Sequence, residues 1–89
     1  MEKRTITIIN KLGLHARAAA KLVNTSSLFN ANITLAREDK EVDAKNIMSV
    51  LLLAASQGTE LEISAEGDDA LDAIVALEQL INDRFGEAE

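Results

Sequence analysis

The chain passes from loop to helix within residues 10–23, NKLGLHARAAAKLV. Gly13 indicates a tight turn, because glycine accepts backbone angles that other residues resist. From Ala16 onward the composition becomes rich in alanine, the residue with the highest helix propensity. The sequence therefore predicts a helix that begins immediately after His15. One face of this helix carries Ala19, Leu22, Val23 and Ser26.

Alternation of apolar and polar residues predicts four strands in the rest of the chain. They are expected at Thr5–Ile8, at Asn32–Arg37, around Val42, and around Leu61 and Ile63. The polar residues 38–40 separate the second strand from the third as a turn.

Two further helices are expected. Asn46 is a good N-cap for a helix over Ile47–Ala55, which ends near Gly58. The acidic segment Gly67-Asp68-Asp69 starts the last helix, where negative charge suits the helix dipole. That helix has an apolar stripe made of Leu71, Ile74, Leu77, Ile81 and Phe85.

The order β-α-β-β-α-β-α predicts the fold class. Hairpin and crossover units of this kind build an α+β fold, a two-layer open-faced sandwich. We expect a four-stranded, mostly antiparallel sheet with three helices on one face. No linker or repeat divides the chain, so residues 1–89 are expected to form a single domain.

Composition excludes several classes of function. The chain has no cysteine, so it can form no disulfide and no thiolate metal site. Its net charge is −6 and it has neither Trp nor Tyr, so a general nucleic-acid partner is not expected. No apolar run is long enough to span a bilayer and no secretory signal is visible, so we expect a cytoplasmic protein without membrane insertion. A monomer is expected.

Charge is distributed unevenly around the only histidine. No Asp or Glu occurs between Lys3 and Arg37, although the chain as a whole is acidic. The amide hydrogens of a helix's first turn, here those of Ala16 and Arg17, have no intrahelical partner and attract anions. His15 can act as a nucleophile near neutral pH, and the Arg17 guanidinium can bind phosphate oxygens.

These features leave other roles for His15 open. A lone histidine is more often a surface or capping residue than a nucleophile, and helix-start geometry alone favours that interpretation. A metal site lacks a second His or any Cys, and a hydrolytic triad lacks a Ser or Cys placed against this base. No cofactor is expected.

Residues 10–23 resemble the active-site segment of the HPr family, the histidine-containing phosphocarriers of phosphoenolpyruvate-dependent phosphotransferase systems. The match rests on Gly13-Leu14-His15-Ala16-Arg17, with Ala19 and Val23 following. It continues through Asp43–Val50 and Gln57–Glu60 to Ile63–Asp68, so it covers nearly the whole chain.

The resemblance implies a stoichiometric phosphoryl carrier and not an enzyme. Phospho-enzyme I, itself charged by phosphoenolpyruvate, would phosphorylate His15 on Nδ1, and the group would pass to a histidine on a IIA domain. Arg17 matches the arginine that accompanies the phosphohistidine.

The second helix is apolar almost all round, and a two-layer fold leaves one of its faces exposed. By resemblance, Ile47, Met48 and Leu51 match positions that dock on enzyme I and IIA domains. We therefore expect a docking patch beside His15, with Ala20, Lys21, Asn24 and Ser27 around it.

Three positions depart from the family pattern. Ala18 replaces the usual proline, which should relax the start of the helix slightly. Leu12 stands where a polar residue is common. Asn46 occupies the position of a regulatory serine, so that control is expected to be absent, and Ser49 cannot take over the role.

Two other functions remain as alternatives. A regulatory binding module would use the phosphorylation state of His15 to control a target protein without onward transfer. A ligand-sensing βαββαβ domain would bind a small molecule and would be unaffected by His15→Ala. Within the carrier hypothesis, residues 10–13 and the missing serine lean towards the nitrogen-type regulatory chain over sugar uptake.

Overall fold

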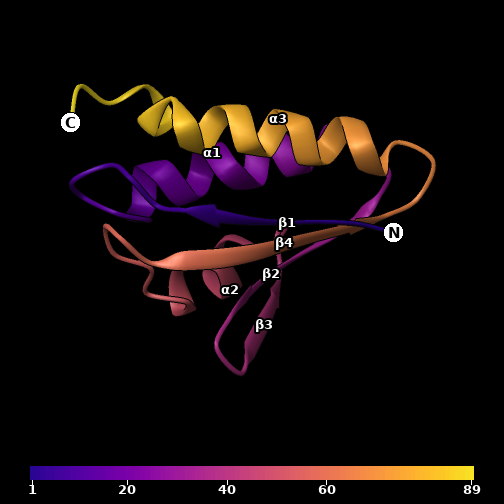
Figure 1. Ribbon diagram of the computed structural model, residues 1–89, viewed down its shortest axis with the longest axis horizontal. Helices are drawn as coiled ribbons and strands as arrows, with labels where there is room; N and C mark the ends of the chain where they lie inside the picture. Colours follow the sequence, from indigo (N-terminus) through magenta and orange to yellow (C-terminus); the bar gives the residue numbers. More distant parts are fainter.

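Four strands form one antiparallel sheet in the order β1-β4-β2-β3 (Figure 1). The strands are β1 (Glu2–Thr7), β2 (Asn32–Arg37), β3 (Lys40–Asp43) and β4 (Glu60–Glu66) in a computed structural model that describes residues 1–89. Ile63 of β4 faces Leu35 of β2 on one side and Arg4 of β1 on the other. All three pairings are antiparallel, which makes the sheet more regular than the mostly antiparallel sheet predicted from the sequence.

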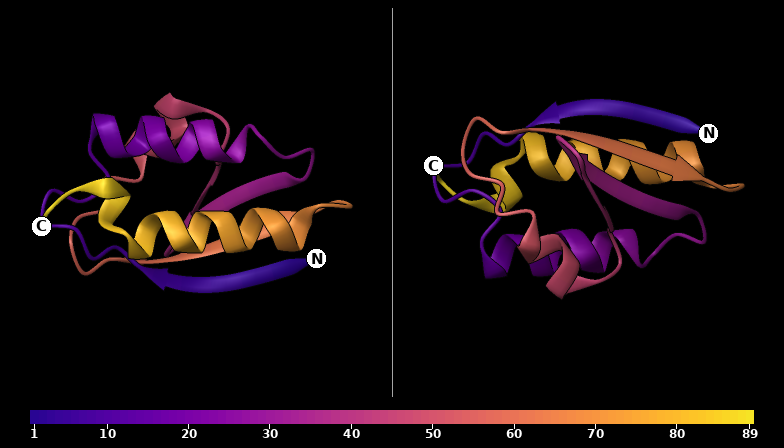
Figure 2. Two further views of the ribbon diagram at one scale, coloured as in Figure 1. Left: turned by 90° about the horizontal axis from the view of Figure 1, so that it is seen from above. Right: turned by 90° about the horizontal axis from the view of Figure 1, so that it is seen from below.

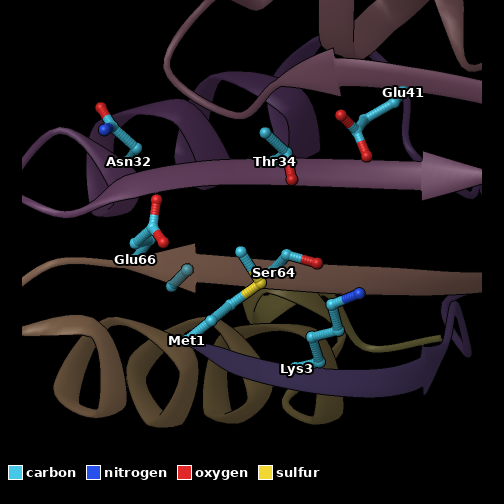
Figure 3. Close-up of a pocket in the computed structure, with 8 residues that line it drawn as sticks. Met1, Lys3, Asn32, Thr34, Glu41, Ser64 and Glu66 are labelled. Carbon is cyan, nitrogen blue, oxygen red and sulfur yellow. The ribbon is translucent and has the colours of Figure 1, made fainter.

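The two faces of the sheet differ as alternation along the strands predicts. In β4, Leu61, Ile63 and Ala65 are buried, while Glu60, Glu62 and Glu66 are exposed. The face away from the helices carries polar side chains from neighbouring strands, among them Lys3, Thr34 and Ser64 (Figure 3). The predicted open-faced sandwich is confirmed.

Three helices cover the other face: α1 (Ala16–Ser26), α2 (Ile47–Leu52) and α3 (Ala70–Asn82). Helices α1 and α3 lie side by side along the sheet, and α1 also contacts α2 (Figure 2). Small residues on the buried face of α1, Ala18 and Ala19, allow this close packing. None of the helices has both the length and the apolar character needed to cross a membrane.

Helix α2 is shorter than predicted. It begins after Asn46, whose side chain accepts a hydrogen bond from the Ser49 amide at 3.1 Å, but it ends at Leu52 and not at Ala55. The Arg37 guanidinium binds the carbonyl oxygens of Leu53 and Ala54 at 2.8 and 2.9 Å. Ala54 has a φ of +51°, which turns the chain out of the helix. The cap was predicted correctly, whereas the long-range Arg37 contact had no signal in the local pattern.

The ends of two other elements also differ from prediction. Strand β1 runs over Glu2–Thr7, so Ile8 lies beyond it, although its side chain is fully buried. Helix α3 ends at Asn82, and Phe85 follows in a separate 3-10 turn, η1 (Arg84–Gly86). Ile74, Leu77 and Ile81 are buried as expected, but Leu71 is 51% exposed. Phe85 therefore reaches the core from a turn instead of from the helical stripe.

Candidate functional site

The turn before α1 is fixed by contacts with the loop that follows α2. The Leu14 amide donates to the Ala55 carbonyl at 2.8 Å, and the Gly13 amide donates to the Asn10 carbonyl at 3.1 Å. Gly13 has a φ of +69°, and a Cβ at this position would lie 2.7 Å from the Ala55 oxygen. Only glycine accepts both the positive φ and the close approach of this carbonyl oxygen. The turn therefore fixes the position of His15, which follows Leu14.

His15 is the N-cap residue of α1, with extended backbone angles of φ −77° and ψ −179°. Its side chain makes no capping hydrogen bond, so the imidazole does not occupy the first-turn amides. No acidic residue lies in that first turn. The ring therefore stands at the positive end of a helix whose first amide hydrogens have no intrahelical acceptor. With 26% of the side chain exposed, the imidazole is accessible and is not packed inside the molecule.

The imidazole contacts a residue that the sequence did not identify. Its Nε2 atom is hydrogen-bonded to Oε2 of Glu87. The other carboxylate oxygen of Glu87, Oε1, accepts a hydrogen bond from Nδ2 of Asn10 at 3.0 Å. Because a carboxylate only accepts hydrogen bonds, Nε2 must carry the ring hydrogen in this arrangement. In a neutral ring, Nδ1 is then the unprotonated nitrogen.

The C-terminal segment (residues 85–89) lies beside the loop between β1 and α1 (Figures 1 and 2). Lys21 Nζ donates to the Phe85 carbonyl at 2.6 Å. Two bonds join Lys11 and Glu89: the Lys11 amide donates to the Glu89 carbonyl at 3.0 Å, and Lys11 Nζ lies 3.4 Å from Glu89 Oε2. The segment is thus held on both sides of Glu87. Nothing in the local sequence pattern signals these contacts, because the partners are more than sixty residues apart.

Hydrogen bonding lowers the pKa of Glu87 below its ordinary value of 4.5. The bond with His15 is the largest cause, followed by the bond from Asn10, and the charge of Arg17 acts in the same direction. Partial burial opposes the shift by disfavouring the charged form. The other charged groups nearby, Lys11 and Glu89, pair with each other. Because the pKa of Glu87 is lowered, its carboxyl is ionised at neutral pH.

Acid should remove the contribution of Glu87 to stability. Above about pH 4.5 the carboxylate is charged in both the folded and the unfolded chain, and its hydrogen bonds contribute fully to the free energy of unfolding. As the pH falls through the lowered pKa of the folded state, the unfolded chain binds the proton first and this contribution is lost. We expect the difference in free energy of unfolding between the wild type and Glu87→Gln to shrink between about pH 7 and about pH 3.

Urea unfolding of both proteins across this pH range measures that difference. The comparison with Glu87→Gln is needed because hydrogen bonds from the Asn30 and Ala31 amides also lower the pKa of Asp69, which weakens the fold in acid independently. If the difference in unfolding free energy stays constant down to about pH 3, the hydrogen bonds of Glu87 do not stabilise its ionised form.

Arg17 lies one residue into α1 and is exposed. Together with Lys11, Leu12 and Glu87 it lines a shallow, open pocket. Its guanidinium makes no side-chain hydrogen bond or ion pair within the protein. The structure thus brings Arg17 and His15 to the same end of α1, as the sequence predicted. No three His, Cys, Asp or Glu side chains gather closely enough to hold a metal ion.

The residues predicted for docking lie on α1, at its C-cap Ser27 and on α2, and the two helices pack against each other. Ile47 and Met48 are exposed, by 38% and 66%, whereas Leu51 is partly buried against the core. Lys21, Asn24 and Ser27 of the first helix region are exposed and Ala20 is half-buried. Leu12, which the sequence marked only as a departure from the family pattern, is 67% exposed. Sequence reasoning missed Leu52, which is 70% exposed, since it does not depart from an ordinary apolar pattern.

Comparisons with known proteins decide the family. A family model described as the PTS HPr component phosphorylation site, where PTS is the phosphotransferase system, matches residues 2–83. The chain belongs to the HPr family. The resemblance drawn from residues 10–23 and the later segments is confirmed.

Relatives of HPr type match the chain over its whole length. The phosphocarrier protein HPr of Xylella fastidiosa is 52% identical over 87 residues, which cover 98% of both chains. The HPr of Neisseria meningitidis serogroup A is 46% identical over 89 residues, all of both chains. A crystal structure of HPr-C-His from Thermoanaerobacter tengcongensis matches with a TM-score of 0.97 at 48% identity and covers 100% of both chains. This HPr chain is therefore a phosphocarrier of the phosphotransferase system, an identity that supports a carrier role.

Proposed function

We propose that His15 accepts a phosphoryl group on Nδ1 from phospho-enzyme I and passes it to a histidine of a IIA domain. Residues 1–89 act as one domain and as a monomer in this proposal. The hydrogen bond between Nε2 of His15 and Glu87 is the observation that carries it. That bond occupies one ring nitrogen and leaves Nδ1 with a free electron pair.

Transfer to Nδ1 needs no group that this site lacks. The Nδ1 electron pair attacks the phosphorus of the donor phosphohistidine, and the bond from phosphorus to the donor nitrogen breaks with its electron pair returning to that nitrogen. Nδ1 is bonded to Cγ and so lies on the main-chain side of the ring. We propose that a phosphoryl group there lies close to the first-turn amides of Ala16 and Arg17, which favour anions.

Arg17 supplies the side-chain charge for the same group. Its exposed guanidinium, free of partners within the protein, can bind two phosphoryl oxygens at once. Such positioning and charge stabilisation account for most of the catalysis of phosphoryl transfer, so small neighbours that admit a partner's histidine also help. The small side chains of Ala16 and Ala20 in α1 suit such an approach.

The docking patch would bring the partner histidine to this place. Ile47 and Met48 of α2 supply exposed apolar surface, and the exposed polar residues Lys21, Asn24 and Ser27 surround it. An apolar centre with a polar rim is typical of protein interfaces. Leu12, which lines a pocket with Arg17 and Glu87, adds exposed apolar surface. We propose that enzyme I and IIA domains use this patch in turn.

Onward transfer separates the carrier from a regulatory module. The chain is first labelled with enzyme I and radioactive phosphoenolpyruvate, and enzyme I is then removed before a IIA domain is added. A carrier loses its label to the IIA domain within the time of mixing, whereas a regulatory module keeps it. Label that never leaves the chain, with any IIA domain of the same cell, would refute the proposed function.

The same assay can distinguish the two pathways. The segment Asn10–Gly13 and the presence of Asn46 in place of a serine favour the nitrogen-type chain. We therefore expect faster transfer to a nitrogen-type IIA domain than to a sugar-specific one. A preference for the sugar-specific domain would assign the chain to sugar uptake instead.

A further inference from the structure

We propose that Glu87 is a positioning residue that holds His15 in the tautomer with hydrogen on Nε2 and an unprotonated Nδ1. The inference rests on the proposed function, because it concerns how that same imidazole is prepared for attack. Glu87 touches only the far nitrogen of the ring and would not contact the incoming phosphoryl group. It acts through His15.

The first observation is that the Glu87 carboxylate has little freedom to move away. Its side chain is only 12% exposed, and both of its oxygens are hydrogen-bonded, one to His15 and one to Asn10. The segment is tied down before it by Lys21 at the Phe85 carbonyl and after it by Lys11 at Glu89. The carboxylate is thus presented to Nε2 by a rigid support and not by a free chain end.

The second observation is that Asn10 fixes the direction of the network. Asn10 is fully buried, and its Nδ2 donates to both the Gly13 carbonyl at 2.8 Å and Glu87 Oε1 at 3.0 Å. The amide oxygen Oδ1 has no partner in the fold. A reversed amide would turn this oxygen against two other acceptors, so the observed orientation is the only favourable one. Asn10 therefore requires an acceptor at the Oε1 position of residue 87.

Charge balance gives Glu87 a second role in the transfer step. When Nδ1 of the neutral ring attacks phosphorus, Nε2 keeps its hydrogen and the ring becomes positively charged. The ionised carboxylate at Nε2 stabilises that charge, as a buried aspartate does for the histidine of a hydrolytic triad. No proton needs to enter or leave during the step. In onward transfer the positive ring is also the better leaving group, which keeps the carrier reversible.

The two substitutions at position 87 have different consequences. In Glu87→Gln the amide oxygen must face Asn10, because Asn10 offers only hydrogens there. The Gln NH₂ group then faces Nε2 and requires an electron pair on it, so the ring hydrogen moves to Nδ1 and blocks the attacking atom. In Glu87→Ala the ring is released and both tautomers are available. The isosteric variant should therefore be the slower of the two.

The test combines a spectroscopic and a kinetic measurement on the full-length chain. Long-range ¹H–¹⁵N correlation spectra report which imidazole nitrogen of His15 carries hydrogen, before any phosphorylation. Steady-state kinetics with enzyme I, using the chain as the varied substrate, separate kcat from KM. We expect hydrogen on Nε2 in the wild type and a shift towards Nδ1 in Glu87→Gln. Outer partners that orient a histidine typically contribute about 10- to 100-fold, so kcat should fall about 10-fold in Glu87→Ala and about 100-fold in Glu87→Gln, with KM unchanged.

Glu89→Gln is the matched control, because it changes a carboxylate of the same segment that pairs with Lys11 and not with His15. Its tautomer should be that of the wild type. Two spectroscopic results would overturn the inference: hydrogen on Nδ1 in the wild type, or an unchanged tautomer in Glu87→Gln. Two kinetic results would also overturn it: a Glu87→Ala variant as slow as Glu87→Gln, or one faster than the wild type. The tautomer of the folded wild type decides the matter even if a variant is unstable. Failure of the proposed function is distinguishable, since it would appear as labelling that does not require His15, or as label that never passes to a IIA domain.

Discussion

A His15→Ala variant should take up no phosphoryl group from phosphoenolpyruvate and enzyme I, whereas the wild-type chain should take up a single acid-labile group. His15 is the only histidine of the chain, so no second imidazole can replace it. The expected loss is complete to the background of the assay. Radioactive labelling followed by brief acid treatment measures both the amount of label and its acid lability.

The loss of labelling should not come from unfolding. The His15 side chain makes no capping bond and is 26% exposed, so its removal creates no cavity in the core. A circular dichroism spectrum like that of the wild type would establish this. Ser49→Ala serves as the control for hydroxyl phosphorylation at the start of α2, and it should retain full labelling. Label that persists in His15→Ala, or disappears in Ser49→Ala, would place the acceptor elsewhere.

Phe85→Ala should be the most destabilising single truncation near the site. Phe85 is the largest of the fully buried side chains, and its removal should lower the unfolding free energy by about 3–5 kcal/mol. That is a large share of the roughly 5–15 kcal/mol available to a small domain. Urea unfolding monitored by far-ultraviolet circular dichroism measures the change.

The substitution should also disturb the site, because Phe85 anchors the segment that presents Glu87. Losing the ring frees the Phe85 carbonyl from Lys21 and allows the Glu87 carboxylate to leave His15. Leu71→Ala, at a 51% exposed position of α3, is the control and should change the unfolding free energy by less than about 0.5 kcal/mol. A Phe85→Ala variant within about 1 kcal/mol of the wild type would show that the core does not depend on this turn.

Much of the fold was predictable because its signals are local. Alternation in residues 32–37 gave β2 with the bounds that the structure has, and alanine content placed the start of α1 at Ala16. The cap formed by Asn46 was also correct, since a capping side chain acts within one turn. These features depend on neighbours in the sequence, which periodicity and propensity describe well.

The errors share a long-range origin. Helix α2 ends at Leu52, and Arg37 of strand β2 binds the carbonyl oxygens of the next two residues, Leu53 and Ala54. Phe85 leaves the helical stripe because the chain turns to cover the core and to place the next residues beside His15. Glu87 and Asn10 escaped detection for the same reason: an acidic residue near the end of a chain is usually solvated, and only the folded arrangement joins it to the imidazole.

Nuclear magnetic resonance of the phosphorylated chain shows which atom carries the phosphoryl group, which we propose to be Nδ1 of His15. The chain is labelled with ¹⁵N-histidine and phosphorylated by enzyme I, and the nitrogen that couples to ³¹P is assigned. We expect coupling to Nδ1 while Nε2 remains hydrogen-bonded to Glu87. Coupling to Nε2, or phosphorus bound to any other residue, would show that Nδ1 is not the acceptor.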